Sequence, residues 1–248
     1  MRLYASCTEM YSDVRRDLHE MGTLVHPQTM QDRNVADNPN YRTLELSPYC
    51  FTILDGGDRV TWLIRMKKSW EWVEAELKER VRCHPTPSDP TVGVNPGRAW
   101  LQRQEVWLPF LHGGRFAYTY SERINRGALV GRTSSSALRQ VISELQLHPD
   151  TRQAVLPIFN GDLDMMNMGG IARIPCSMHY QFLRRDSKLH MIYTMRSSDF
   201  LSHFPYDIAL ALELQAYIAR IIEIPAGPMT FFTGSLHLYA KDADPGVF

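Results

Sequence analysis

The side chains best suited to chemistry in this chain lie in one stretch, residues 174–207, and the first of them is Cys176. A thiolate at Cys176 could attack an electron-poor carbon, particularly with an arginine nearby to stabilise its charge. The alternative is a buried structural cysteine, because free cysteine is among the most buried residue types. Cys7, Cys50 and Cys83 fit this second description, which leaves Cys176 as the candidate nucleophile.

A second group, Arg196, Ser197 and Asp199, follows at the end of an expected strand. A guanidinium beside a hydroxyl suits a phosphate monoester, because the planar arginine fork matches the phosphate oxygens. The alternative is a surface ion pair. Arg152, in the turn HPDTR (148–152), could supply a second guanidinium, or it could bind the last carbonyl groups of a helix.

Asp207 precedes a long apolar segment that is typical of a helix, and it could serve simply as the N-cap. Alternatively, its carboxylate could accept a hydrogen bond from the exocyclic amino group of cytosine. An Asn or Gln in its place would suit the mixed donor–acceptor edge of uracil. His237 and Tyr239 alternate on an expected last strand, so both face one side. They could hold a sugar hydroxyl or form a half-buried pair.

Composition and charge narrow the classes of function. The chain has 27 Lys and Arg against 27 Asp and Glu, so no basic field attracts a nucleic acid polymer. No apolar run is long enough to span a membrane, and the N-terminus lacks the apolar core of a secretory signal. Four cysteines without paired spacing indicate a reducing cytoplasm. Without HExxH or another metal-ligand spacing, we expect no bound metal.

The elements that must position these side chains follow from hydrophobic periodicity and turn signals. Helices are expected at residues 3–22, 60–81, 134–147 and 207–222, with a short one within 99–111. Strands are expected at 49–54, 154–159, 180–183, 189–195 and 229–239, and another within 116–124 that leads into a surface loop. Loops are expected at 25–43 and 160–174. We find no repeat or linker, which predicts one α/β domain spanning residues 1–248.

Taken in order, these motifs resemble the thymidylate synthase family. The matching segments are Tyr120, HPDTR (148–152), Cys176, Gln181-Phe182, RSSD (196–199), PYD (205–207) and GSLHLY (234–239). Their spacing matches over residues 120–242, whereas the earlier part of the chain matches only loosely. The resemblance implies the thymidylate synthase fold, an α/β (α+β) arrangement with a mixed β-sheet flanked by helices. It also implies a homodimer in which two sheets pack against each other, with Gln181 on the dimer sheet.

The resemblance implies a role for each candidate residue. Cys176 would add to carbon 6 of a pyrimidine nucleotide, so that carbon 5 attacks the one-carbon unit of 5,10-methylenetetrahydrofolate, without a metal. The residues implied to bind substrate are Arg196, Ser197, Ser198, Asp207, His237, Tyr239 and, from the other subunit, Arg152. The residues implied at the folate are Asp199, Tyr206 and Tyr120, with Asp199 also catalytic.

Two assignments keep alternatives open. A helix glutamate would order water and shuttle protons, and Glu74 is our choice from its offset after Arg65. Glu71 and Glu76 are the alternatives. An arginine of the N-terminal loop, Arg33 or Arg42, would also contact the phosphate.

Departures from the family pattern point to the substrate. Members that act on dUMP have Asn at the position of Asp207, whereas members that act on cytosine nucleotides have Asp. The segments at 195–199 and 234–242 resemble phage dCMP hydroxymethylases most. Gln153 stands where a second arginine is expected, and His203 replaces a glycine near the folate. Few residues follow Tyr239, and a shorter tail over the folate would admit water, which favours hydroxymethylation over reduction to a methyl group.

These points make a dCMP 5-hydroxymethyltransferase the leading hypothesis, an enzyme that makes a modified nucleotide for phage DNA in the host cytoplasm. Its rivals are a thymidylate synthase or dCMP C5-methylase, a CMP hydroxymethylase, and a non-catalytic nucleotide-binding relative. The expected ligands are a pyrimidine nucleotide and a folate, with no direct contact to nucleic acid or membrane.

Overall fold

A mixed eight-stranded β-sheet forms the centre of the computed structural model, which describes residues 1–82, 94–126, 129–130, 133–134, 136–168 and 172–243. The sheet order is β1 (Arg2–Tyr4), β6 (Tyr49–Ile53), β12 (Ala226–Tyr239), β11 (Lys188–Asp199), β10 (Ser177–Arg185) and β9 (Val155–Pro157). The last residues of β12 also pair with β5 (Thr43–Leu46), which in turn pairs with β2 (Thr23–Val25). The β11–β12 and β1–β6 pairs are parallel, and the other pairs are antiparallel.

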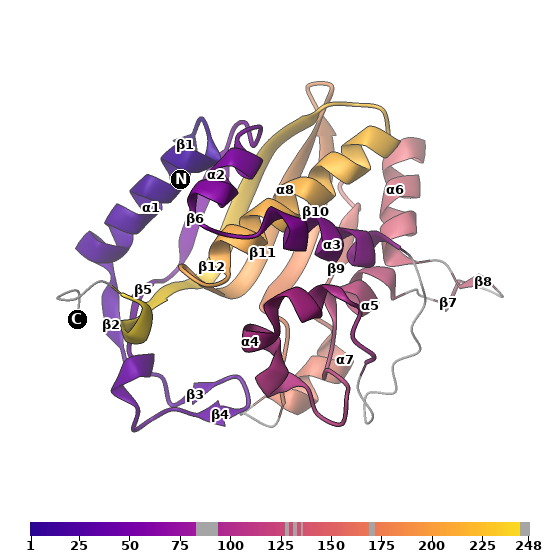
Figure 1. The fold of residues 1–248 in the computed structure, drawn as a ribbon. Coiled ribbons are helices and arrows are strands. Elements are labelled where there is room, and N and C mark those ends of the chain that lie inside the picture. The colour runs from indigo at the N-terminus through magenta and orange to yellow at the C-terminus, as the bar shows by residue number, and fades with distance from the viewer. Residues whose placement is uncertain (83–93, 127–128, 131–132, 135, 169–171, 244–248) are drawn as a thin grey trace.

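Helices flank this sheet (Figure 1). The longest, α8 (Phe204–Ile221), lies across the face of β11 and β12, and α2 (Arg59–Arg65) and α3 (Trp70–Val81) pack on it. Because α8 lies between the sheet and these helices, most of its residues are buried, as its nearly continuous apolar sequence requires. At the two ends of the sheet, α1 (Cys7–Met21) packs near β5 and α6 (Ala137–Leu147) packs on β9 and β10.

Shorter elements complete the chain between the main ones. The segment after β2 contains a small hairpin of β3 (Thr29–Met30) and β4 (Arg33–Asn34) and the turn η1 (Pro39–Tyr41). The segment between α3 and β9 contains η2 (Ala99–Arg103), α4 (Gln104–Trp107), η3 (Leu108–Phe110), α5 (Tyr120–Asn125), β7 (Leu129–Val130) and β8 (Thr133–Ser134). The remaining ones are α7 (Gly161–Asp164), η4 (Met165–Asn167) and η5 (Ala240–Asp242).

Aromatic side chains join the sheet to α8. The rings of Phe51 and Phe231 stack at 5.2 Å, and Phe204 of α8 meets Phe231 edge-on at 5.5 Å. Tyr180 and Tyr193 stack at 4.4 Å on the neighbouring strands. Contacts of this kind add to the burial of large apolar surface, so the N-terminal turn of α8 is held against the sheet.

A two-residue turn sets the register of β10 against β11. Asp186 and Ser187 have φ values of 51° and 59°, the left-handed conformation that a type I′ hairpin turn requires at both central positions. The turn joins the two strands that were predicted at 180–183 and 189–195. It pairs Arg185 with Lys188 and, at the other end of the hairpin, brings the backbone N–H of Arg196 to the carbonyl of Cys176 at 2.8 Å.

Most of the main predicted elements are confirmed, and the differences have local causes. The helix predicted at 60–81 is two helices, because Lys67 has a φ of 56° and Ser69 caps a new helix through a 3.1 Å bond from the N–H of Trp72. The strand predicted within 116–124 is wrong. Thr119 caps the short helix α5 there. Most residues of α5 are buried, so the predicted surface loop is wrong as well.

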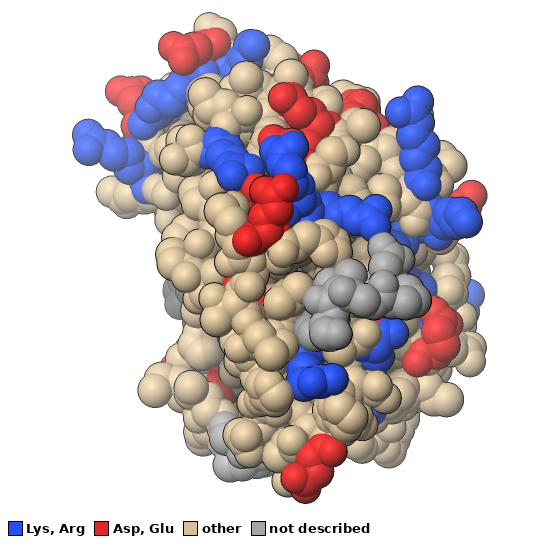
Figure 2. Space-filling view, turned by 90° about the vertical axis from the view of Figure 1, so that its left-hand side faces the viewer, with Lys and Arg blue, Asp and Glu red and all other residues tan. Residues whose placement is uncertain are grey.

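Charges of both signs share the surface. Figure 2 shows one face of the molecule, on which Lys and Arg side chains are intermingled with Asp and Glu rather than gathered into a field of one sign. None of the helices in the described ranges is both long and apolar enough to cross a membrane.

Candidate active site

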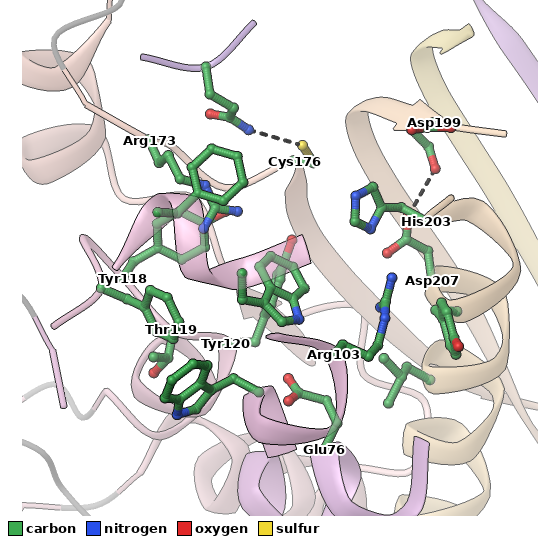
Figure 3. Close-up of a pocket in the computed structure, with 18 of the residues that line it drawn as sticks. Glu76, Arg103, Tyr118, Thr119, Tyr120, Arg173, Cys176, Asp199, His203 and Asp207 are labelled. Atoms are coloured by element: carbon green, nitrogen blue, oxygen red, sulfur yellow. Dashed lines mark hydrogen bonds between the residues drawn. The ribbon is translucent and has the colours of Figure 1, made fainter. Parts of the chain in front are cut away.

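A cavity of about 800 Å³ opens between α3, the segment from η2 to α5, and the ends of β11 and β12. It brings together ten of the predicted site residues: Tyr120, Cys176, Arg196, Ser197, Ser198, Asp199, Tyr206, Asp207, His237 and Tyr239. Figure 3 shows several of them facing one hollow. Glu74, Arg152 and the two alternative arginines of the N-terminal loop lie outside its lining.

The thiol of Cys176 lies next to the predicted anion-binding pair. Its Sγ is 3.6 Å from Nη2 of Arg196 and 3.7 Å from Oγ of Ser197. Gln31, from the β3–β4 hairpin, reaches the same sulfur with its amide nitrogen at 3.8 Å. A cation and two further hydrogen-bond donors therefore contact the sulfur of the candidate nucleophile.

Backbone carbonyls fix the direction of Arg196. Its Nε donates to the carbonyl of Pro175 at 2.9 Å and its Nη2 to that of Ile174 at 3.2 Å. Its Nη1 lies 3.3 Å from Oγ of Ser197, so guanidinium and hydroxyl point to the same place. The alternative of a surface ion pair is wrong, because Arg196 lines the cavity and has no ion-paired carboxylate among the residues that the structure covers.

Asp207 lies inside the first turn of α8, not at its cap. Its N–H donates to the carbonyl of His203 at 2.9 Å, and its carboxylate accepts from the hydroxyl of Ser198 at 2.9 Å. The N-cap alternative is therefore wrong. Burial raises the pKa of Asp207 to about 6, although the Ser198 hydrogen bond and the charges of Arg80 and Arg103 oppose this effect. The result is a carboxylate that changes charge near neutral pH.

Of the three helix glutamates considered from the sequence, Glu76 lines the cavity, whereas Glu74, our choice, lies outside its lining. Trp72 and Arg80 mark the inward face of α3, and Glu76 lies between them one turn from each. Glu74 is two residues from Glu76, which turns it to the opposite, exposed side, and Glu71 is exposed as well. The Glu76 carboxylate accepts from Nε of Arg80 at 2.8 Å.

Arg152 lies in a separate depression on the loop between α6 and β9, together with Glu144 and His148. Its carbonyl accepts from the side-chain amide of Gln181 at 3.0 Å. Its assignment to the site of a partner subunit remains a prediction. In the N-terminal loop, Arg33 stacks on Phe110 at 4.8 Å, and the cavity lining from this loop includes Gln31 rather than either predicted arginine.

Two histidines in the cavity are held towards the neutral form. Burial lowers the pKa of His203 to about 4, with Asp199 opposing this effect. Its ring lies 5.8 Å from that of Trp107. Burial also lowers the pKa of His237, whose ring packs edge-on against Tyr239 at 5.0 Å. Both His237 and Tyr239 line the cavity, as their alternation on the strand predicts.

Tyr120 and Tyr206, the predicted folate-side tyrosines, are tied to the protein frame. The hydroxyl of Tyr120 accepts from Ser177 at 3.3 Å, and that of Tyr206 accepts from the N–H of Ser69 at 3.0 Å. Of the other cysteines, Cys7 is buried and Cys50 is partly exposed, while Cys83 lies outside the described residues.

Sequence reasoning missed two arginines in the cavity wall. The guanidinium of Arg103 lies over Tyr206 at 4.1 Å and over Trp72 at 4.6 Å. That of Arg173 lies over Phe110 at 4.2 Å. For Arg103 a signal was present, the alternation of arginine and aromatic residues in the segment RAWLQRQEVWLPF (98–110), which is typical of stacked guanidinium groups.

Comparison with known proteins identifies the family. A family model described as thymidylate synthase matches residues 59–245, which is most of the chain. The chain belongs to the thymidylate synthase family. A solved structure, the thermostable thymidylate synthase A from Bacillus subtilis, superposes with a TM-score of 0.69 over 94% of this chain and 80% of the other, at 15% sequence identity. This likeness confirms the predicted thymidylate synthase fold.

The chain aligns with curated relatives named thymidylate synthase over part of each protein's length. A putative thymidylate synthase of Methanosarcina barkeri is 29% identical over 129 residues, which are 52% of this chain and 56% of the relative. A thymidylate synthase of Coxiella burnetii is 32% identical over 115 residues, 46% of this chain and 41% of the relative. The chain thus spans about half the length of the curated relatives that it matches.

Proposed function

We propose that this member of the thymidylate synthase family transfers a one-carbon unit to carbon 5 of a pyrimidine nucleoside monophosphate, most specifically as a dCMP 5-hydroxymethyltransferase. One observation carries the proposal: Cys176, the Arg196–Ser197 pair and the carboxylate of Asp207 line the same cavity. The reaction requires three groups of the protein: a nucleophile, a group that binds the phosphate, and a group that hydrogen-bonds to the polar edge of the base.

The nucleotide would lie with its phosphate at Arg196 and Ser197, where guanidinium and hydroxyl converge. His237 and Tyr239 would hold the sugar, and Asp207 would face the edge of the base. We propose that Arg152 completes the phosphate site of a partner subunit in a homodimer, because it lies outside the cavity of its own chain.

The thiolate of Cys176 would form a bond to carbon 6, and the electron pair of the ring double bond would move to carbon 5. Carbon 5 would then bond the methylene carbon, whose bond to the folate nitrogen would break, and carbon 5 would lose its proton. Water would add to that methylene carbon to give the hydroxymethyl group, while departure of the thiolate from carbon 6 restores the ring double bond. Glu76 would order the water that carries protons to and from the ring, held in place by Arg80.

The cavity fits a folate beside the nucleotide, because its volume of about 800 Å³ lies in the range of sites for drug-sized ligands and one wall is aromatic. When bound, 5,10-methylenetetrahydrofolate supplies the one-carbon unit. Trp107, Phe110 and Tyr206 would flank its flat ring, and Asp199 would accept from its N–H groups.

The carboxylate of Asp207 supports cytosine as the base, because an ionised carboxylate accepts hydrogen bonds but cannot donate one to a carbonyl oxygen. A thymidylate synthase is the second candidate, since the curated relatives bear that name.

Release of tritium from carbon 5 of labelled dCMP and dUMP, with methylenetetrahydrofolate present and the products resolved by mass, tests the proposal. We expect release from dCMP with a hydroxymethyl product and tetrahydrofolate. Release from dUMP with dihydrofolate would establish the second candidate instead, and a methylated dCMP would indicate a C5-methylase. No release from either nucleotide would contradict both, and CMP as substrate or a purely binding role would then be tested.

A further inference from the structure

Arg103 is a buried cation that forms no ion pair with a carboxylate in the part of the chain that the structure describes. It ends η2, is 6% exposed, and forms part of the cavity wall. Its Nη1 atom is buried and has no hydrogen-bond partner in the described part of the chain. Burying a guanidinium donor in this way is costly unless an acceptor is supplied, so the atom points to a ligand.

Two other arginines in the described ranges are also buried, and both have an anionic partner. Arg80 and Arg123 are 6% and 5% exposed. Arg80 donates to Glu76 at 2.8 Å, and Arg123 binds both oxygens of Asp164 at 2.7 and 2.9 Å. Arg103 has no such ion pair among the described residues, and the pKa of its guanidinium is lowered by burial. Its burial is therefore not explained by an ion pair with any described residue.

Aromatic rings hold the Arg103 guanidinium in one orientation. Tyr206, Trp72 and Trp107 lie 4.1, 4.6 and 5.8 Å from its central carbon. Stacking of this kind keeps the planar fork fixed while leaving its edge free to donate. Figure 3 shows that edge directed into the hollow beside Asp207 and His203, and the charge of Arg103 acts on both.

We propose that Arg103 is a specificity-determining residue of the base site, where its Nη1 donates to an acceptor atom of the heterocycle while Asp207 accepts from the neighbouring donor. A fixed donor beside a fixed acceptor fits a nitrogen heterocycle whose edge carries an adjacent acceptor and donor, the pattern of a pyrimidine base. The phosphate is the less suitable partner, because Arg196 and Ser197 already converge beside Cys176. This inference rests on the proposed function.

Calorimetric binding of dCMP, dUMP and 2-deoxyribose 5-phosphate to the full chain tests it. The sugar phosphate has no base, so it reports the phosphate and sugar contacts alone. We expect Arg103→Met to weaken binding of the preferred nucleotide about tenfold to a hundredfold, the usual effect of losing a hydrogen bond from a charged donor. Binding of the sugar phosphate should not change, which also shows that the variant is folded. Arg103→Lys should not restore affinity, because a point charge lacks the fixed fork.

Arg220→Met is the matched control. Arg220 is exposed at the end of α8, stacks on Tyr217 at 5.8 Å, and lies outside the cavity lining, so all three affinities should stay the same. Equal weakening of nucleotide and sugar phosphate by Arg103→Met would overturn the inference, and so would unchanged nucleotide binding. The proposed function fails separately, if the wild-type chain binds neither nucleotide more tightly than the sugar phosphate.

Discussion

The hydroxyl of Ser198 donates to the carboxylate of Asp207 across 2.9 Å, which joins the end of β11 to the first turn of α8. The bond occupies one oxygen of the carboxylate and directs the group into the cavity. Ser198 of the neighbouring strand thus holds the Asp207 side chain in one rotamer. The protonation state of the carboxylate then determines how it interacts with a ligand.

Replacing Asp207 by Asn should move base preference from cytosine towards uracil, because the amide supplies a donor as well as an acceptor. We expect the ratio of dCMP to dUMP turnover to fall at least about tenfold, the discrimination that one hydrogen-bonding group gives. Competition between the two nucleotides for tritium release measures it. An unchanged ratio would remove Asp207 from the base site.

Affinity for dCMP should rise between about pH 5 and pH 7. The pKa of Asp207 is raised to about 6, so its accepting, ionised form becomes the major one across this range. Binding of 2-deoxyribose 5-phosphate over the same range corrects for titration of the phosphate. After that correction, the Asp207→Asn variant should show a flat profile, and a wild-type profile that is also flat would contradict the assignment.

The same shift predicts a loss of stability as pH rises. Because the pKa is raised in the folded state, the stability that Asp207 contributes is complete below its unfolded pKa near 3.8 and is lost as pH rises through about 6. Its size is at most about 3 kcal/mol, and less because the group faces the water of the cavity. Between pH 4 and pH 7 the free energy of unfolding of Asp207→Asn, measured in urea, should therefore increase relative to that of the wild type. A constant difference between the two proteins over this range would contradict the prediction.

Glu76→Gln should lower the rate of tritium release by about a hundredfold or more, the usual range for loss of a proton-transfer group. The neutral amide keeps nearly the same shape beside Arg80 but cannot carry a proton. Glu74→Gln, on the exposed side of α3, is the matched control and should retain its rate. The reverse pattern would restore our choice from the sequence.

Asp164→Asn should destabilise the fold by about 3 kcal/mol, because it removes the carboxylate that binds both Nη atoms of the buried Arg123 and leaves Glu122, 3.0 Å from its Nε, as the remaining anion. Asp164 is fully buried and binds Arg123 through both oxygens. Asp162→Asn, an exposed change in the same helix α7, should leave the stability nearly unchanged. Thermal or urea unfolding measures both, and equal stabilities would show that the pair contributes little.

The sequence alone predicted those parts of the site whose residues lie close together along the chain. Cys176, Arg196, Ser197 and Asp199 are close in sequence around one hairpin, and two neighbouring strands bring them together. Hydrophobic periodicity also located α8 and β12, because burial imposes a regular spacing on both.

The remaining parts depend on packing that local patterns do not encode. Glu74 and Glu76 are equally good helix residues, and only the direction in which α3 presents Trp72 decides which one reaches the cavity. Arg103 could be identified as a residue of the cavity only from the contact between η2 and α8, which are far apart in the chain. The break at Lys67 likewise follows from Ser69 meeting Tyr206 of α8, a tertiary contact.

Parallel pairing of β11 with β12 places Ser197 opposite Ser235 and Asp199 opposite His237. A slip of one residue would reverse the side on which each of these groups lies, and would expose the apolar residues between them. Ser197 and His237 therefore cannot move apart without disrupting the centre of the sheet. Amide hydrogens in this part of β11 and β12 should exchange with solvent only as fast as the whole molecule unfolds, which makes the site a reporter of global stability.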